Sequence, residues 1–362
     1  MATSSHFLPR SARLAAVCLA LAVTEACGQR PAATKPTPMH PSQTEKFKLS
    51  AGPCVPKGYW VTIQGGSFEG PGNPGFPVPA GHTLRGSWGA SGTAWAVGDE
   101  LQPVPAHLSL LWFSYAENKF YEGDFTLPQA KIQDLLKTGY WDLEKKKPGT
   151  YDEFTVCVLP KGAVVVWLTG NNQVLIGRFQ GHETAANFQQ YYGQADRATM
   201  VKETQQEMPP EVQAQIKAGT ISTKQWDAYL TTYAWRVALN VPFTISQYSL
   251  HGVNAERFSD PLTRDLAPYR QTLLTATPKP VPRKLYLHGQ AEHGAHYEVR
   301  VKAFDEAETM AAYKALHAAS PQSPITLLFT VDKPFQKATM SLQNQAKQIP
   351  LTKSVVEVFS ED

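Results

Sequence analysis

The sequence predicts an α+β protein that is strand-rich, with mostly antiparallel sheets, a few short helices and two domains. Short apolar stretches with two-residue alternation recur between turns, as in Leu108–Tyr115 and Lys119–Leu127. Helical periodicity is confined to brief segments such as Gln129–Thr138. A stretch rich in Pro and Thr interrupts this pattern at 259–282, where we expect the linker between the domains.

The chain begins with the pattern of a lipoprotein signal peptide. Two arginines precede the apolar run 14–23, which is too short to span a bilayer, and Ala26 stands directly before Cys27. Cleavage there makes Cys27 the lipidated first residue of the mature chain. Thr24 and Glu25 depart from the usual residues of such a site, so secretion with an incidental Cys27 is the alternative.

Several prolines follow Cys27 among small and polar residues, which is typical of a flexible tether. Gly28 gives no inner-membrane retention signal, so we expect the protein in the periplasm, anchored to the inner leaflet of the outer membrane. The lipid would be its only membrane contact. The predicted division is 1–26 signal peptide, 27–50 Pro-rich tether, 51–258 strand-rich main domain, 259–282 linker and 283–362 small α+β domain.

Charge and cysteine content narrow the possible functions. The chain has 34 Lys and Arg against 31 Asp and Glu, and no basic run, which argues against nucleic-acid binding. Once the leader and Cys27 are set aside, Cys54 and Cys157 remain. In an oxidising compartment this pair predicts one disulfide, and two buried thiols that never meet are the alternative.

The main domain is predicted to open with a strand at Tyr59–Gln64 and an irregular loop at Gly65–Pro79, because that loop is dense in Gly and Pro. The hairpin Leu108–Leu127 then places Glu122 and Asp124 on the face opposite its buried side chains. Further strands are expected at Phe154–Leu159, Ala163–Leu168, Gln173–Phe179 and Ala234–Val241.

Two short helices are expected before the last of these strands. The first opens at Pro209–Pro210 and ends at Gly219, and the second carries a capping box of Ser222 and Gln225. In the small domain, Asp305 is predicted to cap a helix. The strands expected around that helix are Lys284–His288, Tyr297–Ala303, Ile325–Val331, Lys337–Gln343 and Ser354–Phe359.

Few residues are candidates for carrying chemistry. His288, His293 and His296, with Glu292 among them, are weak candidates for a metal site because their spacing fits no standard pattern. Convergence of these rings would favour a metal-dependent enzyme, whereas a solvent-exposed hairpin loop is the simpler interpretation.

Hydrolytic chemistry has little support in the sequence. No serine stands in a Gly-x-Ser-x-Gly elbow. The carboxylates Glu117, Glu122 and Asp124 fit a solvated turn better than a glycosidase pair. We therefore expect no catalytic residue, no cofactor and no enzymatic activity.

The segment Gly86–Trp95 places two tryptophans among glycines. Trp88, Ser91 and Trp95 are candidate partner-binding residues, since buried aromatic side chains dominate interface energetics. The alternative, which we favour, is that the tryptophans plug the core and pin the loop to the sheet.

Several motifs together resemble a bacterial lipoprotein family, that of domain of unknown function 2931, over about residues 50–255. They are Trp88-Gly89, Trp112-Phe113-Ser114 with Lys119-Phe120-Tyr121, the strand Val164–Leu168 with Ile176-Gly177, and Trp226-Asp227-x-Tyr229 with Tyr233-x-Trp235-Arg236. Members are often encoded near type VI secretion effectors, and lipoproteins beside phospholipase effectors commonly serve as immunity proteins.

The resemblance thus implies a binding protein that neutralises a secreted toxin, with a phospholipase effector as its expected partner. The alternative is an envelope-maintenance or small-ligand-binding lipoprotein without a toxin partner. A pocket lined by Trp88, Trp95 and Trp112 would favour that alternative.

Overall fold

The structure is a computed structural model that describes residues 45–70, 73–92, 101–262 and 273–361. Residues Thr44–Asp362 cluster into one compact unit. The predicted signal peptide, Cys27 and all of the tether before residue 45 lie outside the described residues, as does Trp95.

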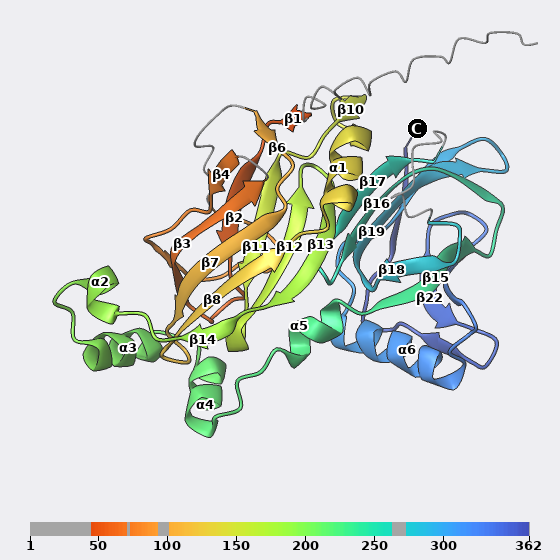
Figure 1. Cartoon of the computed structure of the whole chain (residues 1–362). Coiled ribbons are helices and arrows are strands. Elements are labelled where there is room, and N and C mark those ends of the chain that lie inside the picture. The colour runs from red at the N-terminus through yellow and green to blue at the C-terminus, as the bar shows by residue number, and fades with distance from the viewer. Residues whose placement is uncertain (1–44, 71–72, 93–100, 263–272, 362) are drawn as a thin grey trace, which may run out of the picture. The chain divides into compact units, whose positions relative to one another are not determined.

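Three sheets contain most of the strands, and the protein is strand-rich as predicted (Figure 1). The nine-stranded sheet has the order β2 (Ser50–Cys54), β11 (Glu153–Val158), β12 (Ala163–Thr169), β13 (Gln173–Gln180), β17 (Arg257–Pro261), β16 (Phe243–Gly252), β19 (Pro282–Ala291), β20 (His296–Val301) and β24 (Glu357–Ser360). The six-stranded sheet has the order β14 (His182–Thr184), β8 (Lys119–Thr126), β7 (His107–Ser114), β3 (Val61–Gly70) and β4 (Asn73–Pro77), with β5 (Thr83–Leu84) beside β3.

The third sheet has five strands, in the order β18 (Thr277–Pro280), β15 (Thr232–Leu239), β21 (Ile325–Val331), β22 (Ala338–Gln343) and β23 (Gln348–Pro350). Two small pairs join β1 (Lys46–Phe47) to β6 (Gln102–Pro103) and β9 (Tyr140–Asp142) to β10 (Lys147–Gly149). Among the described strands, only the β2–β11 and β15–β21 ladders are parallel, so the expected antiparallel character is confirmed.

The helices are short apart from the last. They are α1 (Gln129–Thr138), α2 (Phe188–Tyr192), α3 (Arg197–Gln206), α4 (Pro210–Ala218), α5 (Lys224–Tyr229) and α6 (Glu306–Ala319). The carboxylate of Asp305 accepts a hydrogen bond from the Glu308 amide, which confirms the predicted cap of α6. The predicted capping box of α5 is wrong, because Thr223 is the N-cap residue and no side chain caps the helix.

The inner face of the six-stranded sheet packs against β11–β13 of the nine-stranded sheet. The ring of Phe68 on β3 lies 4.5 Å from that of Phe154 on β11, and Phe125 on β8 lies 5.4 Å from Phe179 on β13. Because successive side chains of a strand point to opposite faces, the residues between these buried ones face outward. The six-stranded sheet therefore has a buried inner face and a separate outer face.

The expectation of an irregular loop at Gly65–Pro79 is wrong, because β3 runs through the glycines and β4 pairs with it. A Cβ at Gly66 would lie 2.6 Å from Leu110 Cδ2, so glycine permits a close approach of β3 and β7. A register shift between Ile63 and Gly65 accommodates the irregularity. Glycine here allows tight strand pairing, a role that composition does not distinguish from that of a turn.

Strand pairing crosses the predicted linker 259–282. β16 pairs with β19 on its far side, and β15 pairs with β21. The linker itself contains the described strand β18 and part of β17. The bounds of the two predicted domains stay a prediction. These ladders are the contacts by which the two predicted domains would hold together.

Candidate functional site

One half of the outer face of the six-stranded sheet is covered by an aromatic cluster. Phe113 on β7 and Phe120 on β8 point outward and meet Phe188 of α2 at ring distances of 5.7 and 6.5 Å. Arg197, the first residue of α3, lies 5.3 to 5.7 Å from the three ring centres and donates to Asn118 Oδ1 at 2.8 Å. These contacts fix α2 and α3 over one end of the sheet (Figure 1).

The sequence analysis missed α2 and α3. Their signals were the two N-cap residues, because the side chain of Asn187 accepts from the Gln189 amide and that of Asp196 accepts from the Thr199 amide. The apolar stripe that would have strengthened those signals is weak in α3, where Val201 is the buried residue.

Beyond the aromatic cluster, outward-facing residues on paired strands form rows across the outer face, and most of them are polar. The row next to the cluster joins Gly65, Leu111, Glu122 and His182, which are paired across β3, β7, β8 and β14. The next row joins Ser67, Ser109 and Asp124. We call these two rows the outer groove, since a hollow of about 360 Å³ opens among them.

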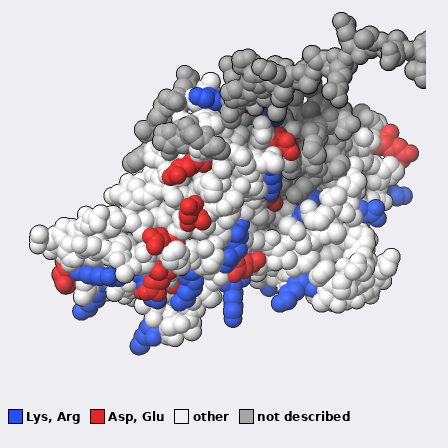
Figure 2. Space-filling model, in the orientation of Figure 1, with Lys and Arg blue, Asp and Glu red and all other residues white. Residues whose placement is uncertain are grey.

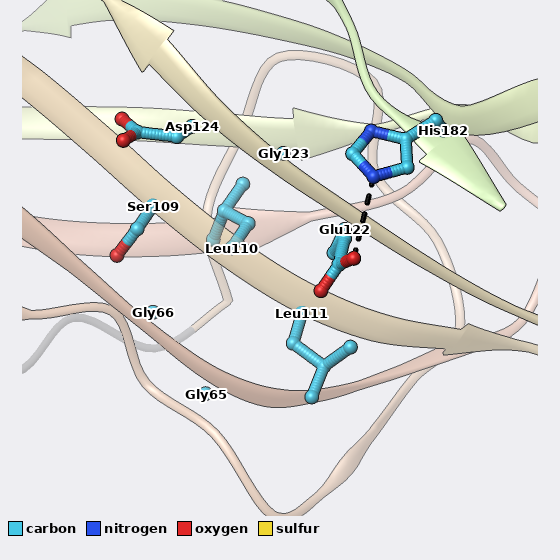
Figure 3. Close-up of a pocket in the computed structure, with 9 residues that line it drawn as sticks. All are labelled: Gly65, Gly66, Ser109, Leu110, Leu111, Glu122, Gly123, Asp124 and His182. Atoms are coloured by element: carbon cyan, nitrogen blue, oxygen red, sulfur yellow. Dashed lines mark ion pairs between the residues drawn. The ribbon is translucent and has the colours of Figure 1, made fainter. Parts of the chain in front are cut away.

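The outer groove is hollow at Gly65, which has no side chain on the outer face (Figure 3). No atom lies within 4 Å of where a Cβ of Gly65 would stand. Glu122 and Leu111 lie at one end and Asp124 and Ser109 at the other, with Gly123 between them. The lining residues are Gly65, Gly66, Ser109, Leu110, Leu111, Glu122, Gly123, Asp124 and His182.

The electrostatics of the outer groove are set by carboxylates whose partners in the chain are imidazoles. His182 Nε2 lies 3.3 Å from Glu122 Oε1, and His107 Nδ1 lies 3.6 Å from Asp124 Oδ1. An imidazole compensates a carboxylate only when it is protonated. Figure 2 shows acidic side chains on the face over β7 and β8, with Lys and Arg gathered toward α3 and α4. Two carboxylates, and no Lys or Arg, are thus among the described residues that line the groove.

The three carboxylates of this hairpin differ in environment. Glu122 and Asp124 are solvated as predicted, with 46 % and 75 % of their side chains exposed. The same expectation is wrong for Glu117, whose side chain is 3 % exposed. Its oxygens accept from Tyr121 Oη at 3.1 Å and from the Lys161 amide at 3.0 Å. Burial and then the Glu117 charge raise the pKa of Tyr121. The buried Glu117 carboxylate thus links the turn of this hairpin to the Lys161 amide.

Trp88 packs against the core. Its Nε1 donates to the Val253 carbonyl at 2.8 Å, and its ring meets Trp167 edge-on at 5.0 Å. Trp112 is fully buried and stacks on Tyr121 instead. The two tryptophans therefore have different ring neighbours, and Trp88 serves the packing role that we favoured.

Of the other two candidate partner-binding residues, only Ser91 lies within the described residues. Ser91 Oγ donates to Glu153 Oε1 at 2.6 Å, and Trp95 lies outside the described residues. A partner-binding role for this segment stays a prediction.

Cys54 and Cys157 lie directly opposite each other on the parallel strands β2 and β11. Both are buried thiols, and the strand register sets them side by side. Burial and then the neighbouring thiol raise the pKa of Cys157. The alternative in which the two thiols never meet is therefore wrong, and the disulfide stays a prediction.

The histidines of the weak metal candidate face different partners. His288 Nδ1 lies 2.6 Å from Glu361 Oε1, whereas the His293 ring lies 6.0 Å from Tyr297. His296 Nε2 lies 3.4 Å from Gln290 Nε2. In the part of the chain that the structure describes, no three His, Cys, Asp or Glu side chains are arranged to hold a metal ion.

Comparison with known proteins identifies a family but not an activity. No curated protein and no solved structure matches the chain significantly. Among the helices of the described ranges, none has both the length and the apolar character needed to cross a bilayer. A family model described as "Protein of unknown function (DUF2931)" matches residues 35–223, just over half of the 362 residues. The matched residues include the β3–β7–β8 face and the aromatic cluster over it. Because the match spans more than half of the chain, the chain belongs to the DUF2931 family.

Proposed function

We propose that this protein is a lipoprotein of the outer membrane, facing the periplasm, that binds and neutralises a secreted toxin, a type VI secretion phospholipase effector. The single observation that carries the binding role is the outer groove, a hollow of about 360 Å³ on the part of the sheet face beyond the aromatic cluster. The leader pattern ending at Cys27 supports the location. The kind of partner is what the resemblance implies, because members are often encoded near type VI secretion effectors.

A rigid, charged sheet face suits a protein that blocks another protein. Side chains on paired strands are held by the ladder, so little conformational entropy is lost when a partner docks. A lipid on Cys27 would confine the protein to the membrane that a phospholipase attacks, which raises its effective concentration there. Occlusion of the effector therefore needs no catalytic residue in this chain.

The test is to express the neighbouring gene product in the periplasm with and without this protein. We expect the two proteins to co-purify and the cells to survive only when both are present. In the variant Cys27→Ser the complex should still form in vitro, but protection should weaken because the protein is no longer held at the membrane. Absence of both a complex and protection would end the proposal.

A second candidate, small-ligand binding, is favoured by a different hollow. A pocket of about 620 Å³ lies beside β22 and β23 and is lined by small polar and apolar side chains, among them Met340 and Leu351. This volume is within the range of about 300–1,000 Å³ that is common for ligand sites. Native mass spectrometry of protein purified from cell envelopes should then detect a bound small molecule, and an unliganded mass would count against this candidate.

A further inference from the structure

We infer that the outer groove receives a cationic segment of the partner protein, with an arginine or lysine side chain seated between Glu122 and Asp124. The inference rests on the proposed function for the source of that segment, which is the effector. It adds the chemistry of the contact surface, which the family assignment leaves open.

The spacing of the two carboxylates suits a guanidinium group. Glu122 and Asp124 stand two residues apart on the outer face of β8, which places their backbones about 7 Å apart. A planar guanidinium that donates to a carboxylate on each side, over about 2.8 Å each, fits that separation. The residue between them, Gly123, faces the buried side of the sheet, so no side chain of β8 stands between the two carboxylates.

The apolar part of the groove suits the stem of the same side chain. Leu111 is half-buried at the groove, and the empty space above Gly65 lies beside it in the same row. Arginine and lysine pack their methylene chains on apolar surface while the charged head stays at the rim. Ser109, directly opposite Asp124, adds a hydroxyl group that can accept from the same head.

Charge complementarity selects a cation over other occupants. No Lys or Arg is among the described residues that line the groove. By contrast Glu183, at the edge strand β14, is already compensated by Lys119 Nζ at 2.5 Å. The ion partners of Glu122 and Asp124 in the described structure are the imidazoles of His182 and His107, so no Lys or Arg competes there with a cation from outside. Charges at a rim mainly raise the association rate and make binding dependent on salt.

The first experiment measures the affinity of the mature, full-length protein for the neighbouring gene product at low and high salt. The double variant Glu122→Lys with Asp124→Lys should bind at least tenfold more weakly at low salt and should lose most of the salt dependence. The matched control is Glu144→Lys with Glu292→Lys, which changes charge equally in the exposed β9–β10 and β19–β20 turns. Equal affinities of the two double variants would overturn the inference.

The second experiment does not need the effector. The probe is a labelled peptide of alternating arginine and threonine, compared with one of alternating glutamate and threonine. The arginine peptide should bind the wild type at low salt and bind the neutral variant Glu122→Gln with Asp124→Asn at least tenfold more weakly. Equal binding to both proteins, or no binding to the wild type, would overturn the inference.

The two experiments separate the two proposals. Failure of the effector to form a complex, together with selective peptide binding, would refute the proposed function and leave the cationic site intact. A complex that forms equally well with the charge-reversed protein would refute the cationic site and leave the proposed function intact.

Discussion

His251 on β16 shows how burial sets the charge of one residue. Its side chain is partly buried, and burial, followed by the nearby Lys284 and Arg257 charges, lowers its pKa to about 4. The pKa of histidine in an unfolded chain is about 6.5. The unfolded chain therefore takes up this proton at a higher pH than the folded one.

The stability that comes from keeping His251 neutral is present above about pH 6.5 and is lost as the pH falls toward 4. The wild type should lose roughly 1–2 kcal/mol more of its unfolding free energy between pH 7 and pH 4 than His251→Gln does, after allowance for solvent screening. Urea titrations at three pH values measure the difference. Parallel losses in both proteins would contradict this account.

Gly89 illustrates a backbone constraint at the same scale. Its φ is +68°, and a Cβ added there would stand 2.0 Å from the Ala255 Cβ. Gly89→Ala should therefore cost about 3 kcal/mol or more of unfolding free energy. The control is Gly92→Ala, where no atom lies within 4 Å of the added Cβ, and it should change stability little. Thermal unfolding of the two variants measures this difference in stability, and equal melting temperatures would refute the packing role of Gly89.

At the scale of elements, some helices and strands could be predicted from local sequence pattern, whereas others depend on contacts between distant segments. The hairpin of β7 and β8 and the helix α1 followed from periodicity, with bounds within about two residues of those observed, and the start of α6 followed from its Asp305 cap. The strand β3 did not, because Gly66 is required by the approach of Leu110, which is distant in sequence. The helices α2 and α3 are held mainly by Arg197 and aromatic contacts with another element, so their own patterns were weak.

Arg197 is the element-scale test of how α2 and α3 are attached. Arg197→Lys keeps the charge but loses the guanidinium that lies over the Phe113 ring and its two hydrogen bonds to Asn118, so it should destabilise the protein by about 1–2 kcal/mol. Hydrogen exchange should speed up in α2 and α3 and stay unchanged in α6. The control Lys202→Arg, on an exposed position of α3, should leave exchange unaltered. Faster exchange throughout the molecule would point to a general loss of stability instead.

At the scale of the whole molecule, long-range ladders bind the two ends of the folded chain. β16 pairs with β19 from Phe243 to Gly252, and β15 pairs with β21. A chain that stops at residue 258 removes both partner strands and leaves two unpaired edges. Such edges are prone to aggregate, and their apolar faces lose the core that covers them.

We therefore expect a fragment of residues 45–258 to be unable to fold cooperatively by itself. Expression of the fragment, followed by denaturant unfolding monitored by tryptophan fluorescence, measures this, with residues 45–362 as the control. A sigmoidal transition of the fragment, similar in slope per residue to that of the control, would show that the predicted main domain is independent of the C-terminal strands.

The sequence by itself determined the class of the protein, the hairpin, the cap of α6 and the family, because these depend on residues close together in the chain or on short motifs. The tertiary structure alone decided which carboxylates are buried and which line the outer groove, and it supplied the register that sets Cys54 opposite Cys157 and the contacts that Trp88 makes. These features depend on pairings between segments far apart in sequence. The free energy of such pairings comes from packing and strand register, which no local pattern records.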